Sequence, residues 1–203
     1  MNSNFAATIG NFDGVHLGHQ ELIGKIKQAA KKNNIKTKVI TFNPYPFEFF
    51  QWKKKRILSE FDKNKFLNNL EIDEVQSIEF NESFRNQTPK EFFINSIVKE
   101  NIKFLIIGKD FKFGKDRSGD IRLLNELCNS NDIELSILDD YKKDDCKVSS
   151  TLVRELLAKS DFMEASKFLG RPYAISGYVI KGKSLGRRLS TPTAKIDIDN
   201  VEF

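Results

Sequence analysis

The chain has 203 residues, of which 39% are hydrophobic and 11% aromatic, a composition typical of a folded protein with one sizeable domain and a small addition. Its formal net charge is +5, but basic and acidic residues are interspersed, and the basic run at residues 53–56 has no aromatic platform for nucleic acid. No apolar run reaches the ~20 residues that span a bilayer. We therefore expect no nucleic acid and no membrane as a partner.

The two cysteines, Cys128 and Cys146, are far apart in the chain, which favours free thiols in a reducing compartment. The N-terminal residues also lack the basic and apolar pattern of a secretory leader. From both observations we expect a cytoplasmic protein.

A glycine-rich turn joins the first expected strand, residues 5–9, to a helix over about residues 19–32. Gly10, Gly14 and Gly18 permit unusual backbone angles and a close approach of a ligand. Free N–H groups and the positive end of the helix dipole favour an anion at the same place. The turn therefore has the composition of a phosphate-binding site.

The only two histidines of the chain, His16 and His19, lie in this turn. Their i, i+3 spacing places both rings on one face of the first helical turn, where both can donate hydrogen bonds to one phosphate group. Gly18 between them leaves room for a ligand near the backbone. Two alternatives remain open: a capped turn without a chemical role, and a metal half-site, which is the weaker one because zinc needs three or four ligands.

The next strand is expected over residues 36–42, and prolines at positions 44 and 46 stop it. The aromatic residues Phe42, Tyr45 and Phe47 thus come at the carboxyl end of a strand, the edge at which open α/β sheets bind ligands. There they can hold a flat ring. Packing in the core is an equally open interpretation for each of them.

Strands and helices alternate along the rest of the chain. Thr88, Pro89 and Glu91 have the pattern of a capping box, which starts a helix that runs to about residue 99. Further helices are expected over residues 61–70 and 121–131, and further strands over residues 74–78, 104–107 and 134–138. The alternation predicts a doubly wound, Rossmann-like α/β domain with a parallel sheet.

Two further segments have the composition of ligand-binding sites. The loop over residues 108–120 is rich in glycine, charged and aromatic residues, and Asp110 in it can accept hydrogen bonds from a ligand or from its own loop. Farther along, Ser150 and Thr151 start a helix, and Arg154 follows one turn later. Two hydroxyls and a guanidinium at a helix start form a second anion site, able to hold the outer phosphates of a nucleotide.

Four ordered motifs together resemble the FAD synthetase module of the bacterial bifunctional riboflavin kinase/FAD synthetases, which are nucleotidyltransferases of the HxGH type. The motifs are the turn with His16-Leu17-Gly18-His19, the segment Thr41-Phe42-Asn43-Pro44-Tyr45-Pro46, the loop Gly108-Lys109-Asp110-Phe111-Lys112-Phe113-Gly114 and the helix start Ser149-Ser150-Thr151-Leu152-Val153-Arg154. The resemblance extends from Phe5 to Leu169. One position departs from the family, because Tyr45 stands where the family usually has histidine.

The resemblance implies FMN adenylyltransferase activity, in which ATP and FMN give FAD and pyrophosphate with Mg2+. It implies that His16, His19 and Arg154 are catalytic. The residues expected to contact ATP are Gly10, Phe12, Asp13, Gly14, His16, His19, Ser150, Thr151 and Arg154. Those expected to shape the flavin site are Phe42, Pro44, Tyr45, Pro46, Asp110, Phe111 and Phe113. No metal ligand is assigned.

The C-terminal stretches 169–180 and 186–195 are similar to the opening of the family's riboflavin kinase module. We therefore predict a FAD synthetase domain over residues 1–170 and an incomplete start of a riboflavin kinase β-barrel, a C-terminal β fragment, over residues 171–203. The kinase barrel needs roughly a hundred further residues, and Lys195 stands where that module has asparagine. For both reasons we expect no riboflavin phosphorylation by this chain.

Two other functions stay open. One is that of another HxGH nucleotidyltransferase with a pyridine nucleotide or phosphopantetheine acceptor, against which the aromatic residues and Asp110 favour a flavin. The other is a non-catalytic flavin- or nucleotide-binding protein, which the departure at Tyr45 would fit.

Overall fold

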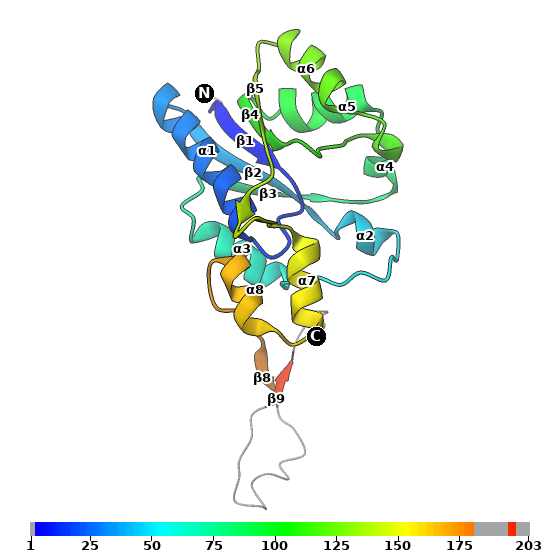
Figure 1. Ribbon diagram of the computed structural model, residues 1–203. Helices are drawn as coiled ribbons and strands as arrows, with labels where there is room; N and C mark the ends of the chain where they lie inside the picture. Colours follow the sequence, from blue (N-terminus) through cyan, green and yellow to red (C-terminus); the bar gives the residue numbers. More distant parts are fainter. Residues whose placement is uncertain (1–2, 181–194, 198–203) are drawn as a thin grey trace, which may run out of the picture.

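A five-stranded parallel sheet forms the centre of the computed structural model, which describes residues 3–180 and 195–197 (Figure 1). Its strands are β1 (Phe5–Ile9), β2 (Lys36–Asn43), β3 (Glu74–Glu79), β4 (Ile102–Gly108) and β5 (Glu134–Leu138). All four pairings are parallel, and the strand order is β3-β2-β1-β4-β5. The order reverses between β1 and β4, and in open sheets this switch point is where the carboxyl ends of the strands leave a crevice for ligands.

Helices connect the strands and cover the sheet. The longer ones are α1 (Leu17–Asn33), α3 (Glu60–Asn68), α5 (Pro89–Phe93) with its continuation η1 (Ile94–Val98), α6 (Ile121–Asn129), α7 (Ser150–Ala158) and α8 (Phe162–Leu169). Figure 1 shows α5 and α6 together on one side of the sheet, and α7 and α8 beyond its carboxyl edge. Three short helical segments complete the set: α2 (Pro46–Phe49), α4 (Glu82–Arg85) and η2 (Lys115–Arg117).

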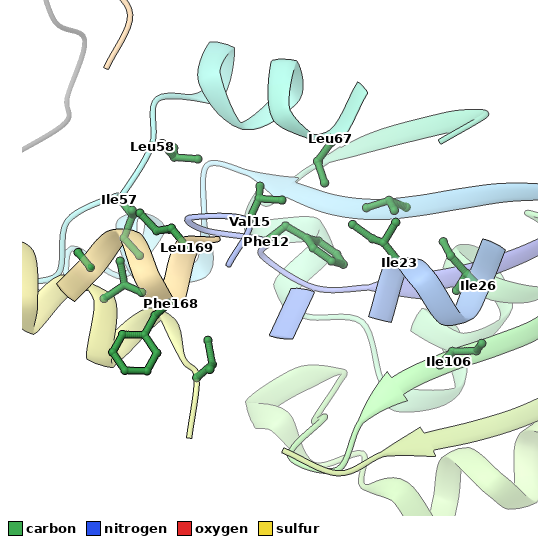
Figure 2. Packing of buried hydrophobic residues seen from close by; sticks show 14 of the residues in the cluster. Phe12, Val15, Ile23, Ile26, Ile57, Leu58, Leu67, Ile106, Phe168 and Leu169 are labelled. Atoms are coloured by element: carbon green, nitrogen blue, oxygen red, sulfur yellow. The ribbon is translucent and has the colours of Figure 1, made fainter. Parts of the chain in front are cut away.

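Each face of the sheet carries its own hydrophobic core, because successive strand residues point to opposite faces. On β4, Ile106 belongs to one cluster and Leu105 to the other. The first cluster contains Ile23, Ile26 and Leu67 from α1 and α3, together with Phe12 and Val15 from the turn after β1 (Figure 2). The second contains Phe92, Phe93, Ile97, Leu124 and Cys128 from α5, η1 and α6. Helices on both faces confirm the doubly wound α/β fold.

The capping box at Thr88 is confirmed, whereas the end of its helix differs from the expectation. The Thr88 hydroxyl accepts a hydrogen bond from the N–H of Glu91 at 3.3 Å, and the Glu91 carboxylate accepts one from the N–H of Thr88 at 2.8 Å. After Phe93 the backbone widens into a π-helix over Ile94–Val98, and Lys99 N–H donates to the Ile94 carbonyl five residues back. The predicted α-helix is therefore α-helical only in its first half.

The C-terminal part pairs β8 (Tyr178–Ile180) with β9 (Lys195–Asp197) in antiparallel fashion, which confirms a C-terminal β fragment. Residues 186–194 of the kinase-like stretch lie outside the described residues. Sequence patterns did not predict α8 or the hairpin of β6 (Lys142–Lys143) and β7 (Cys146–Lys147). Within the described ranges, no helix has the length and apolar character that crossing a membrane requires.

The segment after the predicted domain boundary at residue 170 contacts the first domain directly. The Tyr173 hydroxyl donates to the Ile57 carbonyl at 3.0 Å, and the N–H of Ser176 donates to the Asp62 carboxylate at 2.9 Å. The boundary itself stays a prediction, but residues 171–176 share a hydrogen-bond network with the domain before them.

Burial within the sheet sets how much each apolar side chain contributes to stability. Leu105 on β4 is 0% exposed, whereas Ile137 on the neighbouring strand β5 is 42% exposed. Leu105→Ala should lower the free energy of unfolding by about 2–5 kcal/mol, because it removes buried methyl groups and leaves a cavity. Ile137→Ala is the matched control and should cost less than about 1 kcal/mol. Urea unfolding measures both, and equal losses would contradict this account of the core.

Candidate active site

Two segments that the sequence singled out for phosphate binding meet at the carboxyl edge of the sheet. The turn between β1 and α1 lies against the amino end of α7, where the Ser150 hydroxyl donates to the Asp13 carbonyl at 2.8 Å. The Arg154 guanidinium, one turn into α7, donates through Nη2 to the Asp13 carboxylate at 2.6 Å. Thr151 is exposed at the same helix start. The structure thus brings together both predicted anion-binding segments.

Asp13 is the residue that joins them. Its side chain is 1% exposed, and its Oδ1 accepts hydrogen bonds from the N–H groups of Ile57 at 2.9 Å and Leu58 at 3.4 Å. Burial raises the pKa of the Asp13 carboxyl, while the Arg154 guanidinium and the two N–H groups oppose that rise. Because its Oδ2 is taken by Arg154, the carboxylate is held on both sides by the protein itself.

The turn has an unusual backbone in which glycine plays a smaller part than expected. Gly14 has φ +86°, but Phe12 and Val15 also lie in the left-handed region, at φ +53° and +42°. Gly10 and Gly18 do not, so of the three glycines that permit such angles only Gly14 adopts one. A positive φ at a β-branched residue such as Val15 is strained and persists only where surrounding contacts hold it.

Gly18 instead makes room for an imidazole. A Cβ at this position would lie 3.3 Å from the Cε1 and Nδ1 atoms of His16. Gly10 follows β1 directly, and its N–H donates to the Ile40 carbonyl at 3.0 Å. Glycine at position 18 therefore permits the close packing of the His16 ring on the start of α1.

The two histidine rings lie face to face, as their spacing predicts. The centroids of His16 and His19 are 3.6 Å apart and the ring planes differ by 16°. The Phe12 ring packs behind His19 with a centroid distance of 5.0 Å. Phe12, expected among the ATP contacts, has its side chain fully buried in the core, so its visible role is to support His19.

A backbone hydrogen bond determines which nitrogen of His16 carries the proton. His16 is the N-cap of α1, and its Nδ1 accepts a hydrogen bond from the N–H of His19 at 3.3 Å. In the neutral ring the proton is therefore on Nε2, which is the donor that remains for a ligand. The Nδ1 atom of His19 is buried and has no hydrogen-bond partner among the described residues.

Both imidazoles are neutral near pH 7. Burial lowers the pKa of His16 to about 4, and the positive charges of Arg154 and Arg171 act in the same direction. Burial, His16 and Arg171 hold the pKa of His19 well below its usual range. The site therefore offers hydrogen-bond donors on neutral rings beside two fixed guanidinium charges, an arrangement that favours an anion without a charged imidazole.

The side chain of Arg154 is held in place on three sides. Besides the Asp13 contact, its Nε donates to the Lys55 carbonyl at 2.8 Å and its Nη1 to the Ser150 carbonyl at 3.2 Å. Its guanidinium also lies 5.5 Å from the centroid of the Phe47 ring. These contacts orient the positive charge beside the turn before any ligand arrives.

The residues expected at the flavin site are spread over different environments. Phe42 belongs to the second core cluster and packs against Phe80 and Phe84. Phe113 is also buried, next to the half-buried Phe111, and Pro44 and Pro46 are half-buried. Asp110 is exposed and pairs with Lys147 at 2.7 Å. For Phe42 the core interpretation thus describes the side chain in this structure, and Phe113 is buried in the same cluster.

Tyr45 packs inside a charged cluster that the sequence did not reveal. Its ring is fully buried, and burial holds the pKa of its phenol well above the usual range. The centroid of this ring lies 4.5 Å from the Arg56 guanidinium and 4.8 Å from the Lys63 amine. Arg56 pairs with Glu48, while Lys63 is 0% exposed and contacts the Thr41 hydroxyl at 3.3 Å.

A cavity of about 810 Å³ opens beside this cluster, a size typical of small-molecule sites. It lies between the end of β2, the start of α3 and the C-terminal strands. Its lining residues are Asn43, Pro44, Glu48, Arg56, Ser59, Glu60, Phe61, Ser176, Gly177, Tyr178 and Asp197. Pro44 belongs to both the cavity and the expected flavin site, whereas neither histidine belongs to the lining.

Comparisons with known proteins agree with the geometry. The sequence model of the FAD synthetase family matches residues 1–152, and that of riboflavin kinase matches residues 169–202. The bifunctional riboflavin kinase/FMN adenylyltransferase of Buchnera aphidicola subsp. Schizaphis graminum is 46% identical over 204 residues, covering 98% of this chain and 65% of that protein. The Escherichia coli K12 protein of the same name is 35% identical over 194 residues, covering 94% and 62%.

The chain therefore spans less than two thirds of the length of these relatives. Among solved structures, one described as a macrolide-efflux protein from Streptococcus pneumoniae matches with a TM-score of 0.86 at 29% identity, covering 100% of this chain and 67% of that one.

The buried state of His16 should make stability depend on pH. The ring takes up a proton near pH 4 in the folded chain and near pH 6.5 in the unfolded chain. The unfolding free energy should thus be highest above pH 6.5 and fall as the pH decreases toward 4, by on the order of 3 kcal/mol from this ring. His16→Asn keeps an N-cap acceptor and should show a weaker fall in urea unfolding measured at pH 7 and pH 4.5.

The control is Ile137→Ala, which should lower stability equally at both pH values, because the residue does not titrate. Equal pH slopes for the parent chain and His16→Asn would contradict the assignment of a buried, neutral His16.

Proposed function

The chain belongs to the FAD synthetase family, and we propose that it transfers AMP from ATP to FMN, giving FAD and pyrophosphate. The observation that carries the proposal is the stacked pair His16 and His19 beside Arg154, because it offers neutral donors and a fixed positive charge at one point of the sheet edge. The relatives named as FMN adenylyltransferases support the same reaction.

In this reaction a phosphate oxygen of FMN attacks the α-phosphorus of ATP in line, and the bond between that phosphorus and the β-phosphate oxygen breaks as pyrophosphate leaves. No covalent intermediate with the protein is needed, so positioning and charge stabilisation supply most of the acceleration. His16 donates from Nε2 to the reacting phosphate, and His19, stacked on it, faces the same group. Ser150, Thr151 and Arg154 bind the outer phosphates at the start of α7.

Mg2+ fits this site as a companion of the nucleotide. The described residues contain no group of three His, Cys, Asp or Glu side chains that could hold a metal by themselves. Asp13 is the one carboxylate among the residues proposed to contact ATP, and Arg154 takes one of its oxygens. Its other oxygen accepts two backbone N–H groups, so Asp13 has no oxygen left for the ion. Phosphate oxygens and water would therefore be the main ligands, an arrangement common for Mg2+. When bound, the ion neutralises charge on the triphosphate.

For the flavin side we propose that FMN approaches along the Pro44 edge of the 810 Å³ cavity, since this is where the expected flavin segment meets a space of suitable size. Phe42, Tyr45 and Phe113 then support this edge from within the core rather than contacting the ring face to face. We also propose a cytoplasmic location, which the free thiols of Cys128 and Cys146 support.

The direct test is turnover. Purified chain with ATP, FMN and Mg2+ should form FAD that chromatography separates from FMN, and removal of Mg2+ with a chelator should abolish the product because the triphosphate charge is no longer neutralised. A folded chain that binds FMN or ATP but forms no FAD would favour the non-catalytic alternative. Transfer of AMP to a pyridine mononucleotide or to phosphopantetheine, with no FAD formed from FMN, would favour one of the other nucleotidyltransferases.

The histidines and Arg154 should differ in their kinetic effects. His16→Ala or His19→Ala should lower kcat by about two orders of magnitude with a much smaller change in the KM for ATP, since their contacts strengthen in the transition state. Arg154→Ala should also raise the KM for ATP, because a guanidinium on the outer phosphates acts already in the ground state. Steady-state kinetics per folded molecule, with the folded fraction from thermal melting, separate these effects from instability.

Arg154→Ala also leaves the buried Asp13 without its partner, so Arg154→Lys serves as the matched variant that keeps the charge. A lower melting temperature with normal kcat per folded molecule for the histidine variants would show that the turn has only a structural role.

A further inference from the structure

Arg171 reaches into the histidine turn from the segment that follows α8. Its Nη2 donates to the Gly14 carbonyl at 2.7 Å, and its Nη1 donates to the carbonyls of Val15 at 3.0 Å and Leu169 at 3.2 Å. These bonds connect positions separated by more than 150 residues in the chain. The residue lies just past the predicted end of the FAD synthetase domain, in the stretch that resembles the opening of the kinase module.

The two carbonyls that Arg171 holds belong to the strained part of the turn. Gly14 and Val15 have φ angles of +86° and +42°. A left-handed conformation at a residue other than glycine is strained and needs contacts that hold it. Gln20 supplies a second such contact, since its Nε2 donates to the carbonyls of Val15 and Leu169, each at 2.9 Å. His16 follows Val15 directly, so the direction of the Val15 carbonyl fixes where the imidazole begins.

The position of Arg171 is itself well defined. Its guanidinium lies 3.8 Å from the centroid of the Phe66 ring of α3. The preceding Gly170 has φ +72°, where a substitution is strained, and a Cβ there would lie 2.6 Å from the Cδ2 atom of Leu17, so glycine suits this close passage beside α1. The Phe66 ring on one side and the closely packed backbone at Gly170 on the other keep the guanidinium in its hydrogen-bonding geometry.

The charge of Arg171 is directed at the turn. Within residues 3–180 and 195–197, no carboxylate forms an ion pair with it, and its donors go to carbonyl oxygens instead. Burial lowers the pKa of its guanidinium to about 10, while the charge of Asp62 acts in the opposite direction, and the guanidinium is still positive near pH 7. The positive charges of Arg171 and Arg154 both lower the pKa of His16. Arg171 and His16 act in the same direction on the pKa of His19.

We propose that Arg171 is a positioning residue of the adenylyltransferase site, which holds the Gly14 and Val15 carbonyls and thereby sets the orientation of the stacked His16 and His19 rings. The inference rests on the proposed function for its kinetic consequence, but its structural part stands on the turn alone. It follows that the adenylyltransferase site is completed by a residue outside the domain that the sequence predicts. Arg171 adds a link to the histidine turn beside the contacts that Tyr173 and Ser176 make with the same domain.

Two substitutions separate the effect of the paired guanidinium hydrogen bonds from the effect of the positive charge. Arg171→Met removes both and should lower kcat about tenfold or more with little change in the KM for ATP, because a small misplacement of catalytic groups is costly. Arg171→Lys keeps the charge with a single donor group and should lie between Arg171→Met and the parent chain. Arg122→Met is the matched control, since Arg122 has a side chain 90% exposed on α6, and it should leave kcat unchanged.

A readout independent of activity is the NMR spectrum of the imidazoles, because the chain contains only two histidines. In the parent chain and Arg122→Met both rings should give the same stacked-ring chemical shifts, and in Arg171→Met both should move or broaden. Native histidine signals and normal kcat per folded molecule in Arg171→Met, even with a lower melting temperature, would overturn the proposal.

Should Arg171→Met fail to fold, Gln20→Met decides the question, because it removes the other side-chain donor to the Val15 carbonyl without changing a charge. Displaced histidine signals support the proposal that side-chain donors to the Val15 carbonyl position the rings, and unchanged signals overturn it. If the parent chain forms no FAD, the proposed function fails, while the histidine spectra still report whether Arg171 positions the rings.

Discussion

The buried carboxylate of Asp13 is the interaction on which the candidate site depends. The carboxylate accepts hydrogen bonds from two backbone N–H groups of the segment before α3 and from the guanidinium of Arg154 on α7. The backbone carbonyl of Asp13 accepts a hydrogen bond from the Ser150 hydroxyl. A charge with 1% exposure is tolerated only when it is paired, so loss of the Arg154 guanidinium would leave a buried charge that costs several kcal/mol. One carboxylate thereby joins three segments that are distant in sequence.

Around this carboxylate the structure separates charge from proton donation. Arg154 and Arg171 supply fixed positive charge, and burial keeps His16 and His19 neutral beside them. Neutral rings can stack at 3.6 Å, which two charged imidazoles would resist. The strained backbone at Val15 places the rings, and Gln20 and Arg171 both hold the Val15 carbonyl. The neutral state of the two rings and the strained backbone before them therefore both favour the stacked arrangement of His16 and His19.

The departure at Tyr45 is accommodated by the core. A phenol there lies between Arg56 and Lys63, with its oxygen buried and without a hydrogen-bond partner in the described part of the chain. The aromatic ring instead offers its face to two cations, a contact that stabilises buried positive charge. The neighbouring cavity keeps Arg56 and Glu48 in its wall. The proposed flavin side thus borders a packed charged cluster rather than an open aromatic surface.

The sequence by itself determined the fold class and which two segments meet at the candidate site. Alternating apolar strands and capped helices, such as Phe5–Ile9 and the box at Thr88, follow from local periodicity and hydrogen bonding, and the carboxyl edge of a parallel sheet follows from their order. The i, i+3 spacing likewise placed His16 and His19 together. Only the tertiary structure decided which side chains hold them. No local pattern records contacts between distant segments. Such contacts pair Arg154 with Asp13, place Arg171 on the Val15 carbonyl, and bury Phe42 and Tyr45.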